Sequence, residues 1–143
     1  MKVDAILNSK GRGVKTTGPS ATLATVAQRL RLERIGALVV AEGDKMLGII
    51  SERDIVHAFA TDSERAASVQ VTEVMTRDVV SCDPDDSLTR VLGLMTRHRV
   101  RHIPVVEGGQ ILGLISIGDV VKHRLDELEM EAAVLRDSYF AGH

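Results

Sequence analysis

The chain has 143 residues, of which 44% are hydrophobic and 2% aromatic, and its 18 basic and 20 acidic residues give a net charge of −2. This balance argues against a nucleic-acid-binding protein, because single strands are bound by stacking on aromatic side chains and duplexes by a positive field. A single cysteine, Cys82, excludes an intramolecular disulfide, and no apolar run is long enough for a membrane span. We therefore expect a cytoplasmic protein with no membrane or nucleic-acid partner.

The first half of the chain is predicted to form a helix, a hairpin of two strands and a second helix. Apolar residues at helical spacing predict an amphipathic helix over residues 22–34. Two short aliphatic runs, 37–41 and 46–51, are joined by a turn that contains Gly43, which is typical of a strand hairpin. Ser51 then opens a second helix from about Glu52.

The second half repeats this pattern in register. Gly48-Ile49-Ile50-Ser51 returns as Gly113-Leu114-Ile115-Ser116, an offset of 65 residues, and 13 of the 42 positions from Pro19 to Ala60 are identical to their partners at that offset. A repeat is therefore the unit of the fold. The last helix, from about Ile117, is predicted to run on as a long, charged C-terminal helix.

With two copies of the motif, the chain resembles a tandem pair of CBS (cystathionine β-synthase) domains. The residues that carry the resemblance are 35–40 followed by 47–54, and 100–106 followed by 112–119. The resemblance implies an α/β fold in which two β-α-β-β-α repeats pack with pseudo-two-fold symmetry. It divides the chain into a first repeat with its lead-in helix (1–62), a linker (63–70), a second repeat (71–125) and a C-terminal helical extension (126–143). Residues 71–76 resemble the lead-in helix of the second repeat, and residues 3–7 are a weaker version for the first.

The resemblance also implies a regulatory function rather than catalysis. Such pairs bind an adenine nucleotide (AMP, ADP, ATP or NAD) in the cleft between the repeats, and they signal its presence to a regulated protein by a conformational or oligomeric change. A homodimer is expected, with exposed apolar positions of the helices over 22–34 and 52–61 as its contact. The alternatives are a ligand-independent adaptor, an S-adenosylmethionine sensor and a nucleotide-processing enzyme.

The two Ser-x-x-Asp motifs are the predicted centres of the nucleotide sites. A serine at a helix N-cap leaves its hydroxyl and several free amides at the positive end of the helix dipole, where phosphate binds well. An aspartate one turn later can bridge the two hydroxyls of a ribose. The alternative is that each motif only caps its helix. The candidate nucleotide-binding residues are Thr17, Ala37, Leu38, Ser51, Arg53, Asp54, Ser81, Arg101, His102, Ile103, Pro104, Ser116 and Asp119.

Other reactive side chains give no competing site. The basic run over residues 97–102 is either a solvated helix end or a phosphate contact through Arg99 or Arg101. His98 and His102 have the spacing of zinc ligands on one helix, but the helix is predicted to stop between them, so no metal is expected. The sequence contains no GxSxG, HExxH or P-loop motif, and we expect no enzymatic activity and no catalytic cofactor.

Overall fold

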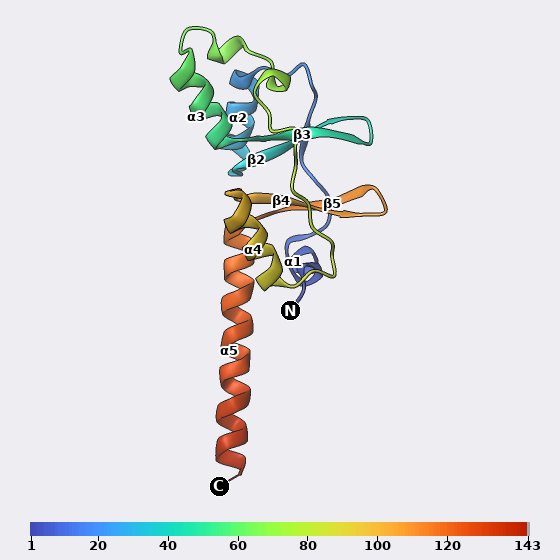
Figure 1. Ribbon diagram of the computed structural model, residues 1–143, viewed down its shortest axis with the longest axis vertical. Coiled ribbons are helices and arrows are strands. Elements are labelled where there is room, and N and C mark those ends of the chain that lie inside the picture. The colour runs from blue at the N-terminus through green and yellow to red at the C-terminus, as the bar shows by residue number, and fades with distance from the viewer. Residues whose placement is uncertain (143) are drawn as a thin grey trace. The chain divides into compact units, whose positions relative to one another are not determined.

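The computed structural model of the chain describes residues 1–142 and divides into two compact units (Figure 1). We call Val14–Val79 the repeat-1 unit. The second, which we call the repeat-2 unit, joins Met1–Gly13 to the chain from Val80 onward. Each unit is built on one of the two sequence repeats.

The repeat-1 unit contains a three-stranded sheet in the order β1-β2-β3, with helices around it. The short β1 is parallel to β2, and β2 and β3 form the predicted antiparallel hairpin. Its elements are β1 (Thr16–Thr17), α2 (Leu23–Glu33), β2 (Ala37–Glu42), β3 (Lys45–Ser51), α3 (Glu52–Thr61) and two 3₁₀ helices, η1 (Ala66–Ser68) and η2 (Val71–Glu73).

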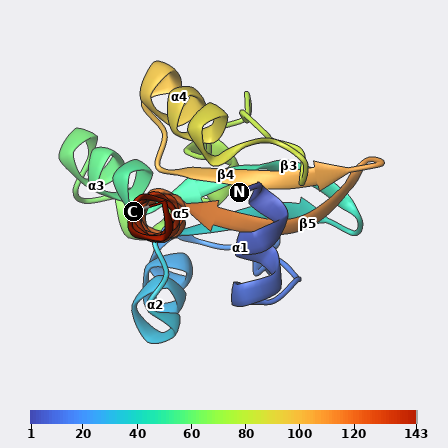
Figure 2. The ribbon, with the colours of Figure 1, turned by 90° about the horizontal axis from the view of Figure 1, so that it is seen from below.

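The repeat-2 unit has the same arrangement around a two-stranded sheet. Cys82 takes the place of β1, since it forms a parallel bridge with Val105 where Thr17 pairs with Val40. Figure 2 looks along α5, with α1 lying beside β5 in the same unit. The elements are α1 (Val3–Lys10), α4 (Leu88–His98), β4 (His102–Glu107), β5 (Gln110–Ser116) and α5 (Ile117–Ala141).

The α/β class and the two repeats are thus confirmed. Aliphatic side chains from the helices and from the buried positions of each hairpin form one core per unit. Leu23, Leu38 and Ile50 are fully buried in the repeat-1 core, and Leu88, Ile103 and Ile115 hold the equivalent places in the repeat-2 core. The apolar faces of α2 and α4 therefore pack on the hairpins of their own repeats.

Both first helices end in the same unusual way. Arg34 and Arg99, which follow α2 and α4, adopt left-handed conformations with φ of 55° and 54°. A residue in the left-handed conformation at this position ends a helix. Glycine adopts this conformation without strain, whereas a residue with a Cβ is strained in it. The chain makes this turn twice, each time with an arginine.

The lead-in segments pack differently from the prediction. Residues 3–7 were expected to be the weaker lead-in of the first repeat, but α1 is a full α-helix whose Val3, Ile6 and Leu7 lie in the repeat-2 core. The 71–76 segment forms only a 3₁₀ turn, and its Val71 and Met75 lie in the repeat-1 core. Each compact unit therefore contains the lead-in that was assigned to the other repeat. The predicted linker, residues 63–70, contributes a buried Ala66 to the repeat-1 unit.

Backbone hydrogen bonds explain this exchange. Ile49 and Thr76 exchange N–H···O bonds of 2.9 Å in both directions. The chain around Thr76, which we call the 76 segment, therefore pairs with the edge of β3. Gly48 makes room for it, because a Cβ there would lie 2.6 Å from the Thr76 carbonyl oxygen. In the repeat-2 unit the Val3 and Asp4 amides donate to the Asp86 and Pro84 carbonyls, which fixes the start of α1.

No helix within residues 1–142 is both long and apolar enough to cross a membrane.

Candidate functional site

Ser51 and Asp54 form a capping box at the start of α3. The Asp54 amide donates to Ser51 Oγ (3.3 Å), while Asp54 Oδ2 accepts hydrogen bonds from the Ser51 amide (2.9 Å) and hydroxyl (3.0 Å). Both bonds to the carboxylate reach one oxygen, and within residues 1–142 Oδ1 accepts none. The carboxylate is half-buried, so a polar acceptor is held at fixed geometry at the helix start.

Ser116 and Asp119 repeat this capping box at the start of α5, with one addition. The Asp119 amide donates to Ser116 Oγ (3.2 Å), and Asp119 Oδ2 accepts from the Ser116 amide (2.9 Å). Lys10 Nζ, from α1, donates to the same oxygen (2.8 Å) and to the Leu114 carbonyl (2.9 Å). Burial raises the pKa of Asp119, but the hydrogen bonds from Lys10 and Ser116 outweigh it and hold that pKa below its ordinary value.

The prediction of several free amides at each helix start is wrong. The Glu52 amide donates to the Gly36 carbonyl (3.0 Å), and the equivalent Ile117 amide donates to the Arg101 carbonyl (2.8 Å). With the N-cap and third helical amides used by the capping box, three of the first four amides in each helix already have acceptors. The hairpin causes this, since its antiparallel pairing continues for one residue beyond Ser51 and Ser116 and places the first helical amide opposite the residue that precedes β2 or β4.

The strand edges next to each motif carry main-chain groups that point away from the hairpin. In β2 the Val39 amide donates to Lys15 on the β1 side, so the alternation of a strand directs the main-chain groups of Ala37 to that same side. β1 is parallel to β2 and begins at Thr16, whose partner is Val39, and so it does not reach back to Ala37. Ala37 lies directly opposite Ser51, which places this edge beside the capping box.

The second hairpin has the same edge at His102. Pro104 accepts from the Cys82 amide (3.0 Å), so His102, two residues earlier, directs its main-chain groups to the same side. His102 lies opposite Ser116. Leu38 and Ile103, in contrast, are fully buried and direct their main-chain groups toward the partner strand of the hairpin. The geometry therefore favours Ala37 and His102 over Leu38 and Ile103 for main-chain contacts.

The remaining candidates lie around these two centres. Thr17 is buried at 8% exposure on β1, whereas Ser81 is exposed just before Cys82. Arg53 and Arg101 are exposed, and Pro104 is buried in β4. The predicted set thus divides between the units: Thr17, Ala37, Leu38, Ser51, Arg53 and Asp54 belong to the repeat-1 unit, and Ser81, Arg101, His102, Ile103, Pro104, Ser116 and Asp119 to the repeat-2 unit.

Sequence reasoning missed Lys10. Its ammonium group is the cation that contacts Asp119, yet it lies 109 residues away along the chain. The available signal was the apolar spacing of Val3, Ile6 and Leu7, which predicts a helix that ends near Lys10. That helix was assigned to the first repeat, so its lysine was not connected with the second motif.

The other reactive residues form no site in the described structure. Residues 1–142 contain no group of three or more His, Cys, Asp or Glu side chains that could hold a metal ion. Helix α4 ends at His98, so His98 and His102 do not share a helix. Burial, with the nearby carboxylates of Asp86 and Asp83, raises the pKa of the Cys82 thiol to about 12. A thiol of this kind is unreactive at neutral pH.

Comparison with known proteins supports the two-repeat fold. The family profile for the CBS domain matches twice, over residues 11–61 and 71–126. The CBS-domain protein ATU1752 from Agrobacterium tumefaciens, a solved structure, is 40% identical and superposes with a TM-score of 0.85 over 87% of this chain and 99% of its own.

Two further relatives extend the comparison. The mitochondrial CBS domain-containing protein CBSX3 of Arabidopsis thaliana is 32% identical over 128 residues, which are 82% of this chain and 62% of that protein, so the chain spans less than two thirds of its relative. The CBS domain pair of protein MJ0100, solved with 5′-methylthioadenosine and S-adenosyl-L-methionine, shares the fold at 23% identity, with a TM-score of 0.77 over 89% of this chain and 98% of its own. Because the CBS-domain profile matches both repeats and the solved relatives share the fold, the chain belongs to the CBS-domain family.

Proposed function

We propose that this chain is a regulatory module that binds an adenine nucleotide, AMP, ADP, ATP or NAD, and that it is not an enzyme. One observation carries the proposal. In each unit a capping box holds an aspartate with one carboxylate oxygen outside the box, directly beside a strand edge whose main-chain groups point away from the hairpin. The arrangement occurs twice at equivalent positions, which a helix cap alone does not require.

Each part of this arrangement suits one part of a nucleotide. The Oδ1 atoms of Asp54 and Asp119 are placed to accept hydrogen bonds from a ribose diol, since a carboxylate has about four lone-pair sites. The main-chain donors and acceptors of Ala37 and His102 suit the edge of a purine. With few helix amides left for phosphate, Arg53 and Arg101 are the candidate phosphate ligands, beside the positive end of a helix dipole.

A second candidate ligand is S-adenosylmethionine. It shares the adenosine part with the nucleotides, and the MJ0100 domain pair was solved with it. It lacks phosphate and carries a positive sulfonium, so its methionine carboxylate is the only anionic group that it offers to an arginine. An adaptor that binds no ligand is the remaining alternative, in which the capping boxes only stabilise α3 and α5.

In this proposal, ligand binding is signalled by a movement of α5 and by a change in self-association. Helix α5 is 25 residues long and carries Asp119 in its first turn, so a ligand that moves its N-terminus moves the whole helix. We expect a homodimer, with Leu32, Val56 and Phe59 exposed on α2 and α3 as its proposed contact. The regulated partner is a further protein. Truncation after Leu125 should leave nucleotide affinity within a few-fold and abolish any ligand-dependent change in oligomeric state.

The identity of the ligand is tested by mass spectrometry of the supernatant after denaturation of purified protein. We expect a stoichiometric adenine nucleotide to be released, and no product to accumulate when the protein is incubated with ATP or NAD. Release of S-adenosylmethionine would identify the second candidate. Accumulation of a product from ATP or NAD would show that the protein is an enzyme.

If no ligand is retained on purification, thermal unfolding decides between a sensor and an adaptor. A ligand that binds only the folded state adds about 2.7 kcal/mol at one hundred times its dissociation constant. The protein should therefore unfold at a higher temperature with AMP, ATP or NAD. An unchanged transition with all three nucleotides and with S-adenosylmethionine supports the adaptor.

A further inference from the structure

Helix α5 exposes apolar side chains at a coiled-coil spacing along most of its length. Helix α5 projects beyond α1 and α4 of its own unit, and the residue match to the CBS domain ends at 126 (Figure 1). Leu125, Leu128 and Leu135 are 56%, 43% and 71% exposed. The full row alternates steps of four and three residues, the spacing of heptad positions a and d: Val121, Leu125, Leu128, Ala132, Leu135 and Tyr139. We call this row the α5 seam.

The seam is distinct from the side of α5 that packs on its own unit. Val120 is fully buried there, and Arg124 and Glu127 are partly buried along the same side. Farther along the helix, Met130 and Val134 line a groove with Met1, and Leu135 is the one seam residue that also lines it. At 3.6 residues per turn, Met130 falls in the outer f position of the heptad, opposite the seam. The seam, about 28 Å long, is thus left for another partner.

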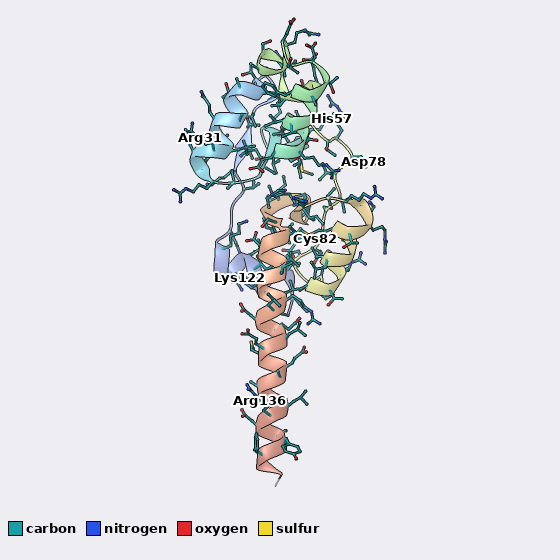
Figure 3. The ribbon with its side chains drawn as sticks, turned by 90° about the vertical axis from the view of Figure 1, so that its left-hand side faces the viewer. Arg31, His57, Asp78, Cys82, Lys122 and Arg136 are labelled. Atoms are coloured by element: carbon teal, nitrogen blue, oxygen red, sulfur yellow. The ribbon has the colours of Figure 1, made fainter. Side chains whose placement is uncertain are left out.

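The charges that flank the seam identify this partner as a second copy in parallel orientation. Position g of one helix lies beside position e of the next heptad in a parallel partner. Arg124 is then beside Glu129 of the second copy, and Glu131 is beside Arg136 of the second copy, so both charged pairs have opposite signs. Arg124 pairs with Glu127 on its own helix, but a guanidinium has five donors and can bind a second carboxylate. Arg136 lies on the projecting part of α5 (Figure 3).

The antiparallel alternative has the wrong charges. If two seams overlap fully in opposite directions, Glu129 approaches Glu129 of the second copy, and Glu131 approaches Glu131 of the second copy. Lys122 is then beside Arg136 of the second copy, so each of these three contacts joins like charges. We propose that α5 forms a parallel, in-register two-stranded coiled coil with α5 of a second copy of this chain, through the α5 seam. This contact needs no nucleotide.

Cysteine cross-linking of the full chain tests the contact directly. In a parallel pair each d position lies opposite itself, so Leu128→Cys and Leu135→Cys should each give a disulfide-linked dimer under mild oxidation. Met130→Cys, on the outer face of the same helix, is the matched control and should cross-link at least about tenfold more slowly. The native Cys82 does not interfere, since it is buried and its thiol pKa is raised to about 12.

Two further variants show whether the seam and its charges hold the pair together. Leu128→Glu places a charge in the seam, so it should reduce cross-linking of Leu135→Cys to the level of the Met130→Cys control while the circular dichroism spectrum keeps the wild-type fold. Arg124→Glu should slow cross-linking about threefold, and Arg124→Glu with Glu129→Arg should restore it.

Several outcomes overturn the proposal. Cross-linking of Leu128→Cys and Leu135→Cys no faster than that of Met130→Cys excludes the contact. A disulfide that forms when Leu135→Cys is mixed with Leu125→Cys, but in neither variant alone, shows an antiparallel pair, because full overlap in opposite directions places Leu125 opposite Leu135 of the second copy. Cross-linking that survives Leu128→Glu shows that another surface brings the helices together.

Discussion

The two capping boxes have the same sequence pattern but different surroundings. Asp54 is held by Ser51 alone, and no cation pairs with it among residues 1–142. Asp119 is held by Ser116 and also by Lys10, which reaches it from α1. The difference arises outside the repeated motif, in the lead-in segment that packs against each hairpin. A shared motif therefore fixes the position of the carboxylate, and the lead-in fixes its charge environment.

The lead-ins also differ in how closely they approach the hairpin. The 76 segment pairs with β3 through its backbone, so a Cβ on Gly48 would lie 2.6 Å from the Thr76 oxygen, which cannot move freely. Against the equivalent Gly113, the nearest atom to a Cβ is the side-chain tip of Leu7 at 2.8 Å. At this point a main-chain oxygen lies nearest to the hairpin in the repeat-1 unit, whereas a side-chain methyl group does so in the repeat-2 unit.

The largest expected effect on stability comes from adding a methyl group at Gly48, where the 76 segment lies closest to the hairpin. Gly48→Ala should reduce the free energy of unfolding by about 2–3 kcal/mol, because the strand and the 76 segment must separate. Gly113→Ala should cost about 1 kcal/mol or less, since Leu7 can change rotamer. Urea unfolding followed by circular dichroism measures both. Gly93→Ala, on an open face of α4, is the control and should be neutral or stabilising. Equal losses at Gly48 and Gly113 would show that the two lead-ins pack alike.

A smaller effect is expected from removing the cation. Lys10→Met should lower stability at pH 7 by about 0.5–1 kcal/mol, since the pair is partly exposed. The lowered pKa of Asp119 means that this stability is present above the ordinary aspartate pKa and is lost as the pH falls through the lowered value. The difference between wild type and Lys10→Met in urea unfolding should therefore shrink as the pH falls below about 3.9.

Lys2→Met is the control for this pH dependence. Lys2 forms a longer, exposed ion pair with Asp85 (3.7 Å), so its removal should change stability little at any pH. A Lys10→Met variant whose stability deficit is the same at acid and neutral pH would show that the ion pair with Asp119 contributes nothing.

The smallest effect concerns a feature that the units share. Arg34 is left-handed at φ 55°, so Arg34→Gly should relieve strain and raise the free energy of unfolding by about 0.5 kcal/mol. Arg31→Gly, inside α2, should lower it by about 1 kcal/mol. Thermal unfolding of the two variants gives the comparison. A loss at Arg34→Gly would mean that the arginine side chain contributes more than its backbone costs.

Much of the fold could be predicted from the sequence, because the information is local or repeated. The helical spacing of Leu23, Val26 and Leu30, the glycine turn at Gly43 and the capping serines each specify a nearby structure. The offset of 65 residues doubled each of these signals. Two in-phase copies therefore predicted both hairpins and the helices that flank them.

The contacts that could not be predicted join segments far apart in the chain. Apolar periodicity shows that α1 has a buried face but does not say which hairpin buries it, so Lys10 was not connected with Asp119. The use of the helix amides was also missed, because the bond from Glu52 to Gly36 depends on the exact turn between strand and helix. Which main-chain groups face outward depends on strand register, and register made Ala37 a better candidate than Leu38.

The measurement that tests the proposed function most directly is calorimetric titration of wild type, Asp54→Ala and Asp119→Ala with AMP, ATP and NAD. Loss of a charge-assisted hydrogen-bond pair to the ribose should cost about 1.5–3 kcal/mol, or roughly ten- to a hundredfold in affinity, at the site whose aspartate is removed. Asp44→Ala, in the exposed β2–β3 turn, should bind as wild type does. Unchanged affinity in both site variants, with their circular dichroism spectra intact, would contradict the assignment of Asp54 and Asp119 to nucleotide binding.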